Sequence, residues 1–377
     1  RENQRDSWSK RHTESFLSDN TSQFSQQNNQ SNGKTDAISG NFRFEWKIDS
    51  LTTIMYRPSV NFSKGNSNSG SFSETLNNEL IPINQKEATN RQTNDRFSTN
   101  GSLQFNRKLN SKGRNIALRL YYNLDNGNSD RYSLANTYYL KYGDSIKVQN
   151  QWIDNLNRNH EYRVQLTYME PVFTNHFIEI NYSYQHRSSL SEKYAYDWND
   201  LEDSYSQYPD TAQSDCYKNK YSIHQVGAFF RTIRTNYFYN IGIEIEPQQT
   251  TNQSYMRDTT LEYSSRNAIN YAPTMNFKYT FSKQTTLRIN YRGRTTQPSM
   301  TDLYSKNDIS DPLNIRLTNP NLKPSFNNNI SATFNTYFTE TLRSFNANFS
   351  YSNTINSTTR IVTYDENTGG RTTQPTN

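Results

Sequence analysis

Few side chains in this sequence have the types and spacing that catalysis or metal binding requires. No phosphate-binding loop, GxSxG nucleophile motif or HExxH zinc motif occurs. Zinc sites need closely spaced Cys and His pairs, and no such pairs are formed by the five histidines, which are His12, His160, His176, His186 and His224. The sequence therefore predicts no enzymatic activity, no cofactor and no zinc site.

An acidic stretch is the remaining candidate for ion binding. The residues DWNDLEDS at 197–204 place several carboxylates in one expected loop. Carboxylate oxygens are ligands that Ca²⁺ prefers, so a calcium site is one interpretation. Solvated charge on a surface loop is the other, and the sequence favours it.

Aromatic side chains form a second candidate site. They fall in segments 125–158 and 187–220, which are expected to be long loops. Aromatic rings on outer loops could stack on sugars or hold a peptide, and they could equally pack the loops against one another. The candidate ligand-contact residues are Trp152, Tyr194, Tyr196, Trp198 and Tyr205.

Apolar and polar residues alternate in about twelve segments of about ten residues each. Successive side chains of a strand point to opposite faces, so each segment predicts a strand with one apolar face and one polar face. The charged residues on the polar face could pair with a plug domain or simply solvate a wet wall. The main ones are Arg43, Glu45, Arg119, Arg163, Glu179, Glu244, Arg288 and Arg292.

Short and long connections alternate along the chain. The short ones are expected at 49–50, 110–113, 170–175, 233–236, 282–286 and 339–343, and the long ones at 64–95, 125–158, 187–220, 247–267 and 293–326. Membrane β-barrels have short periplasmic turns and long extracellular loops. A soluble sandwich also alternates apolar and polar residues, but it has no reason to keep its long loops at one end.

Composition agrees with a polar-lined barrel. Hydrophobic types make up 32% of the 377 residues, below the roughly 45–50% of an average soluble domain, yet 28 Tyr and 20 Phe are present. A barrel with a wet interior has no apolar core to fill, and aromatic residues are typical of its two interfaces. The net charge of +6 is small and dispersed, so no nucleic-acid partner is expected. Outer-membrane lipid is the expected partner.

The expected domain organisation has two parts. Residues 1–36 are rich in Ser, Asn and Gln and are expected to be loop or disordered. Residues 37–377 are expected to form an antiparallel transmembrane β-barrel portion, all-β in class, without a plug or the last strands of a barrel.

The segment from Leu287 to Phe338 resembles a segment of outer-membrane barrels of the TonB-dependent receptor superfamily. It is most similar to the Bacteroidota-type family whose barrel follows a carboxypeptidase-regulatory-like domain and a plug. The shared pattern runs QPS…L, DPLNI and GNPxLKP, with Thr318 here in place of the family's Gly. The matching positions are Gln297, Pro298, Asp311, Pro312, Asn319, Pro320, Leu322, Lys323 and Pro324.

This resemblance implies a function and further partners. Receptors of the superfamily have 22-stranded barrels and import nutrients or siderophores, with energy supplied through a plug and TonB. The motif is expected to form a rigid extracellular connector near the barrel rim. A non-transporting outer-membrane barrel that serves as an adhesin or scaffold is the alternative function, and a secreted soluble all-β binding protein is a third.

Overall fold

The protein is built almost entirely of antiparallel strands. The computed structural model describes residues 2–17, 21–141, 145–257, 259–304, 307–309 and 311–377. Within these residues, fifteen strands form one sheet. They are β1 (Glu2–Phe16), β2 (Ser22–Asn41), β3 (Phe44–Lys47), β4 (Thr52–Leu76), β5 (Pro82–Lys108), β6 (Asn115–Tyr139), β7 (Ser145–Phe173), β8 (His176–Asn199), β9 (Ser204–Tyr205), β10 (Asp215–Ile233), β11 (Tyr237–Met256), β12 (Thr259–Thr280), β13 (Thr286–Thr296), β15 (Ser325–Phe338) and β16 (Arg343–Ile355).

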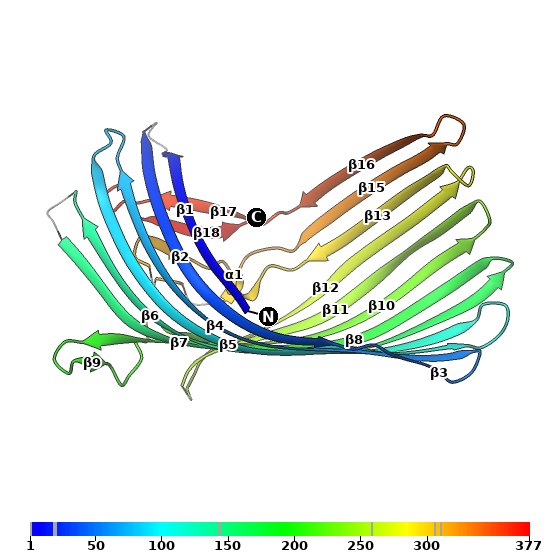
Figure 1. The fold of residues 1–377 in the computed structure, drawn as a ribbon, viewed down its shortest axis with the longest axis horizontal. Helices are drawn as coiled ribbons and strands as arrows, with labels where there is room; N and C mark the ends of the chain where they lie inside the picture. Colours follow the sequence, from blue (N-terminus) through cyan, green and yellow to red (C-terminus); the bar gives the residue numbers. More distant parts are fainter. Residues whose placement is uncertain (1, 18–20, 142–144, 258, 305–306, 310) are drawn as a thin grey trace.

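The strands follow one another in chain order, so the sheet is an up-and-down meander. Its path runs β1-β2-β4-β5-β6-β7-β8-β10-β11-β12-β13-β15-β16, with β3 added beside β4 and β9 beside β8. The sheet curves into an open trough, and β1 and β16 are its two edge strands (Figure 1). The predicted all-β antiparallel class is confirmed. The count of fifteen exceeds the expected twelve, in part because the N-terminal segment is also strand.

A second, smaller unit lies on the concave side of the trough (Figure 1). The short helix α1 (Met300–Tyr304) follows β13, and β14 (Asn314–Arg316) follows α1. In this small sheet, β18 (Arg371–Thr376) pairs parallel to β14 and antiparallel to β17 (Thr359–Tyr364). No helix among the residues described above is long and apolar enough to cross a membrane.

The apolar faces of the main strands are exposed rather than packed into a core. Ile180, Ile243 and Phe349 are 50%, 44% and 61% exposed. The best-defined buried apolar cluster in the described chain is small and lies in the second unit, where Leu303 and Leu322 pack with Tyr221. A soluble sandwich would bury its alternating apolar row between two sheets, so the exposure of these rows excludes that interpretation.

The two rims of the sheet, where neighbouring strands are joined by turns, differ in the length of these connections, as the sequence predicts. At one rim, short turns at 109–114, 174–175, 234–236, 281–285 and 339–342 join neighbouring strands. At the other rim, the prediction of long loops is mostly wrong, because the strands continue through the residues expected to form them. β4 and β5 have 25 and 27 residues and are joined by a turn at 77–81. The expected loops at 125–158 and 247–267 are likewise mostly strand.

The expectation that residues 1–36 are loop or disorder is also wrong. β1 and β2 pair in register from Glu2 with Asp36 to Phe16 with Ser22, and β2 pairs with β4. These residues are Ser-, Asn- and Gln-rich on both faces, so no period-two pattern marks them. Within the sheet β2 is hydrogen-bonded on both sides and β1 on one, and the side chains of both faces can meet water.

Candidate membrane belt and inner cap

An apolar belt crosses the convex face of the sheet along the hydrogen-bonding direction. We define it by two cross-strand rows and the apolar residues between them. The first row runs through Ile54, Phe105, Leu118, Leu166, Tyr182, Val226, Ile245 and Tyr271. The second runs through Ile178, Phe230, Ile241, Met275, Tyr291, Ile330 and Tyr351. Each row is continuous over at least seven strands, so the belt is a property of the sheet and not of single strands.

Aromatic residues gather at both margins of the belt. Toward the short turns, Tyr279 lies 4.6 Å from Phe281 between ring centroids, and Tyr237 stacks on Tyr239 at 6.3 Å. Toward the extended ends lie Tyr162 and Tyr184, whose ring centroids are 6.4 Å apart. Between these margins aliphatic side chains such as Ile180 and Ile243 are frequent, with aromatic rings among them. Membrane barrels place aromatic girdles at both interfaces around an aliphatic band, and the belt has this arrangement.

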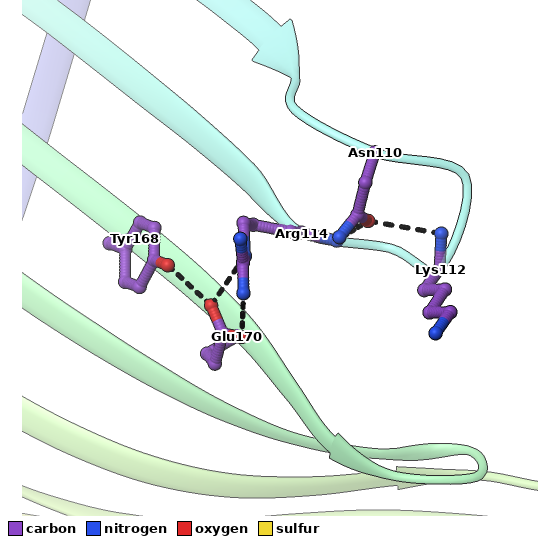
Figure 2. Close-up of polar contacts among 5 residues, drawn as sticks. All are labelled: Asn110, Lys112, Arg114, Tyr168 and Glu170. Carbon is purple, nitrogen blue, oxygen red and sulfur yellow. Dashed lines mark hydrogen bonds and ion pairs between the residues drawn. The ribbon is translucent and has the colours of Figure 1, made fainter.

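A polar cluster marks the short-turn margin of the belt (Figure 2). The Arg114 guanidinium donates from Nε to Glu170 Oε2 at 2.7 Å, and the Tyr168 hydroxyl donates to the same carboxylate. In the turn between β5 and β6 the Asn110 side chain accepts hydrogen bonds from the backbone N–H groups of Lys112 and Arg114, at 3.0 and 2.9 Å. Tyr, Arg and Lys side chains are typical anchors at a membrane–water boundary.

The concave face carries a connected polar network at the level of the belt. Arg163 Nη2 donates to Gln225 Oε1 at 2.7 Å, and Gln225 Nε2 donates to Glu244 Oε2 at 2.6 Å. The Ser183 hydroxyl donates to Gln225 Oε1 at 3.1 Å. These residues come from β7, β8, β10 and β11, so the network ties four neighbouring strands together on the face opposite the belt.

The second unit docks on this concave face, and we call it the inner cap: the connector 297–324 together with the C-terminal segment 359–376. Asp311 forms an ion pair with Lys86 of β5 at 3.0 Å. The Asp311 carboxylate also accepts hydrogen bonds from the backbone N–H of Leu313 and the side chain of Asn314. Burial raises the pKa of Asp311, but the Lys86 charge and these hydrogen bonds outweigh it, so its pKa lies below the usual value.

A tight turn of the inner cap reaches the wall near β2 and β5. Asn84 Nδ2 donates to the Thr368 carbonyl at 2.6 Å, and Gln23 Nε2 donates to the Gly369 carbonyl at 3.1 Å. Gly369 has a φ of +66°, and a Cβ at this position would lie 2.5 Å from Asn84 Nδ2. Only glycine combines this backbone conformation with so close an approach.

A polar cavity of about 370 Å³ lies between the inner cap and the extended part of β8 and β10. Its lining is strongly charged and of mixed sign, with Lys193 and Asp215 from the wall and other groups from the cap. The main charged lining residues are Lys193, Asp215, Asp302, Asp308, Arg316 and Arg360. Such a lining suits a polar or charged small ligand and not an apolar one.

Residues 107–377 match the Outer membrane protein beta-barrel family. The chain belongs to this family. No curated protein matches the chain. As a member of the family, the protein is an outer-membrane protein, and its apolar belt lies where membrane lipid is expected.

Two solved structures of other outer-membrane proteins are similar to this family member. One is the closed form of the ferric-catecholate import receptor Fiu from K12 E. coli, with 11% identity and a TM-score of 0.46 over 89% of this chain and 59% of that chain. The other is the transport unit of the autotransporter AIDA-I from Escherichia coli, with 10% identity and a TM-score of 0.26 over 74% of this chain and 80% of that chain. The chain thus spans less than two thirds of the length of the receptor.

The predicted charged residues all lie on the face opposite the belt, but they do not form one cluster. Arg163 and Glu244 belong to the polar network, and Glu179 pairs with Arg231 at 2.6 Å. Arg43 pairs with Glu45 at 2.9 Å beside the short turns. By register, the same face also carries Arg119, Arg288 and Arg292. Arg231 and Gln225 were missed, because their segment alternates only weakly.

The family-motif residues come together in the inner cap. Asn319 Nδ2 donates to the Pro375 carbonyl at 2.9 Å, and the Asn377 side chain accepts from the Lys323 N–H at 2.6 Å. Gln297 Nε2 donates to Asn270 Oδ1 of the wall at 2.7 Å. Pro298, Pro312, Pro320 and Pro324 lie in the same connector, outside the strands. The expected place near the rim is therefore refined, because the connector folds inward over the concave face.

The predicted aromatic residues lie mainly on strands, so the prediction of loop positions is wrong. Trp152 is in β7, and Tyr194, Tyr196 and Trp198 are in β8, while Tyr205 forms part of the short β9. Trp152 stacks on Tyr196 with centroids 4.8 Å apart, and Trp198 meets Tyr205 at 5.0 Å. Tyr132 of β6 joins them 5.8 Å from Tyr205 and was missed. For the described residues, no group of three or more His, Cys, Asp or Glu could hold a metal ion.

Proposed function

We propose that this chain is the barrel part of a TonB-dependent receptor that imports a polar nutrient or a siderophore across the outer membrane. The observation that carries the proposal is the inner cap, in which the family-motif residues fold over a polar wall and enclose a charged cavity. The cavity lies toward the extended strands, the end expected to face the medium. An import route needs a polar path that is separated from lipid, and the concave face offers one.

The proposal includes partners outside this chain. A plug would sit against the charged concave face, and TonB would act through the plug to release the ligand. Strand β16 runs along the belt and presents an edge that hydrocarbon would leave without hydrogen-bond partners, and β1 forms the other edge of the sheet. We propose that further strands complete a closed barrel of 22 strands. The Bacteroidota-type architecture, with a carboxypeptidase-regulatory-like domain before the plug, belongs to the same proposal.

Uptake by whole cells tests this function. The gene for the full-length protein is deleted and restored in its host, with or without functional TonB, and uptake of labelled siderophores and small polar nutrients is measured. We expect one substrate whose uptake falls at least about tenfold both on deletion and on loss of TonB. Uptake that depends on the gene but not on TonB would contradict an energised receptor, and so would a deletion neutral for every substrate.

A charge reversal in the cavity links uptake to this site. Lys193→Glu changes the lining at the wall, so the half-saturating substrate concentration should rise about tenfold, a loss of roughly 1.4 kcal/mol. Lys64→Glu is the matched control, because Lys64 is 79% exposed on the convex face and far from the cavity in the register. Equal effects of the two substitutions would remove the cavity from the proposed route.

An adhesin is the second candidate function, and one observation favours it. The aromatic residues Trp152, Tyr196, Trp198 and Tyr205 gather beyond the belt on the expected outer side of the cell. Ring faces at such a place could bind partners without any transport. Deletion strains that lose attachment to surfaces while every uptake rate is unchanged would support the adhesin instead of the receptor.

A further inference from the structure

A groove of about 500 Å³ lies on the convex face, outside the concave path used by the proposed function. It crosses β2, β4, β5 and β6 in their extended parts, with Tyr205 of β9 at one side. Its lining is mostly Asn, Ser, Thr and Gln, and the residues that matter most are Asn32, Gly70, Arg91, Tyr132, Asn150 and Tyr205. A groove of this volume falls within the usual range of small-ligand sites.

The register fixes which side chains face the groove. One cross-strand row runs through Asn32, Asn68, Arg91, Tyr132, Trp152 and Tyr196. This row has the same parity as the apolar belt, since the strands keep their register between the two levels. The groove therefore opens outward, away from the cavity and the inner cap.

The hollow exists because one position in its floor lacks a side chain. Gly70 pairs with Gln30 on one side and Thr89 on the other. A Cβ built at Gly70 would meet no atom within 4 Å. The space above Gly70 is thus open, and the neighbouring side chains form walls around it.

The chemistry of the walls is that of carbohydrate recognition. Amide and hydroxyl side chains can donate to and accept from sugar hydroxyls. Tyr132 is 47% exposed, and its ring lies 5.8 Å from that of Tyr205, so the two rings form a wall on which a sugar face can stack. The Tyr205 hydroxyl donates to Asn150 Oδ1 at 3.1 Å, which fixes the orientation of the ring. Among the described lining residues only Arg91 is charged, so most contacts to a ligand would be hydrogen bonds to uncharged groups and ring stacking, and the Arg91 guanidinium can itself donate to sugar hydroxyls.

Position selects the source of the saccharide. Trp152 and Tyr162 lie on the same face of β7, roughly ten residues or about 33 Å apart along the strand, so the groove stands well beyond the upper margin of the belt. At this height, an outward-facing groove meets the carbohydrate of glycolipids in the same membrane. We propose that this groove binds the neutral saccharide chain of outer-membrane glycolipids that surround the protein. It is a contact with the cell's own surface and is separate from the transported ligand.

Direct binding tests the site without any need for transport. The intact protein is extracted from outer membranes in detergent and titrated with oligosaccharide released from the host's own outer-membrane glycolipid, with a neutral glucan of similar length as the second probe. We expect saturable binding of the host oligosaccharide and weaker binding of the glucan. No binding of the host oligosaccharide, or preference for the glucan, would overturn the assignment.

Two substitutions locate the binding. Gly70→Trp fills the hollow from its floor, and Tyr132→Ala removes the stacking wall, so each should weaken binding at least about tenfold. Gly127→Trp is the matched control, because Gly127 lies on the concave side of β6 and its nearest neighbours are 3.9 Å away. Binding equal to that of the unmodified protein in all three variants would place the saccharide elsewhere. Circular dichroism, and the change in gel-electrophoretic mobility when the sample is heated, verify that each variant is folded.

Discussion

Asp311 ties the family-motif connector to the sheet through one partly buried ion pair. Its carboxylate receives the Lys86 ammonium at 3.0 Å and also holds the first turn of its own loop. The Lys86 and Asp311 side chains are 19% and 34% exposed, so the pair is partly shielded from solvent. Removing one partner leaves a partly buried charge without compensation, which costs more than the net strength of the pair.

Lys86→Ala should therefore loosen the inner cap and leave the sheet intact. We expect local opening of residues 311–316 to become easier by about 1–3 kcal/mol, the usual cost of an unsatisfied charged group. Hydrogen exchange resolved by peptide measures this change. Lys64→Ala is the control, since its ion pair with Asp95 has a separation of 3.8 Å and is largely exposed. Equal protection in both variants would show that the pair does not hold the cap.

Docking of the inner cap should also depend on pH. The pKa of Asp311 is lower in the folded state than in the unfolded state. The stabilisation is thus complete above the unfolded pKa of about 3.9 and is lost as pH falls through the lower folded value. We expect the protection factor of residues 311–316, which is the exchange corrected for its intrinsic pH dependence, to be constant above about pH 5 and to fall in acid. Lys86→Ala should flatten this acid response, and an unchanged response in that variant would contradict the assignment.

Gly369 makes a second, backbone contribution to docking. Gly369→Ala would place a Cβ 2.5 Å from Asn84 Nδ2 at a positive φ, and the left-handed conformation alone costs about 1–2 kcal/mol. We expect faster proteolysis within residues 359–376. Gly70→Ala is a suitable comparison, because open space surrounds Gly70. Similar proteolysis of both variants would mean that the turn tolerates a side chain.

In strand β13, one face contacts lipid in the proposed orientation and the other faces water. Ile289 pairs with Phe277 and Ala332 within the belt, while Asn290 points to the concave face. Ile289→Arg should destabilise the protein in lipid by about 2–4 kcal/mol, as a cation near the bilayer midplane does. Asn290→Arg, one residue away, should cost little because its charge meets water. Urea unfolding in lipid vesicles compares the two, and an equal cost would exclude a lipid-facing Ile289.

The elements that the sequence predicts are those that have two different faces. Ile241, Ile243 and Ile245 alternate with polar residues because lipid lies on one side and water on the other. In residues 64–76 both faces meet water, so Ser and Asn occupy both parities and the strand leaves no period-two signal. The sequence also did not predict the inner cap. Its strand β14 pairs with β18, for example Asn314 with Arg371 roughly 57 residues later, and no local pattern specifies such a contact.

At the scale of the whole molecule, the two ends of the sheet should lie on opposite sides of the membrane. Cys216 is 1% exposed and can be replaced by Ser to give a cysteine-free background. A cysteine at Glu79, in the β4–β5 turn, should react with a membrane-impermeant maleimide on intact cells. A cysteine at Lys112, in the turn before β6, should react only after the outer membrane is permeabilised. Labelling of Lys112→Cys on intact cells would reverse the orientation.

In the proposed orientation, the belt contacts hydrocarbon and the opposite face borders water, and every other part of the proposed function depends on this. Spin labels placed singly at positions 287–292 of β13, with the protein in lipid vesicles, report this through their accessibility to oxygen and to a water-soluble nickel chelate. We expect high oxygen accessibility at 287, 289 and 291 and high nickel accessibility at 288, 290 and 292. Nickel access at 287, 289 and 291, with oxygen favoured at the alternate positions, would contradict it.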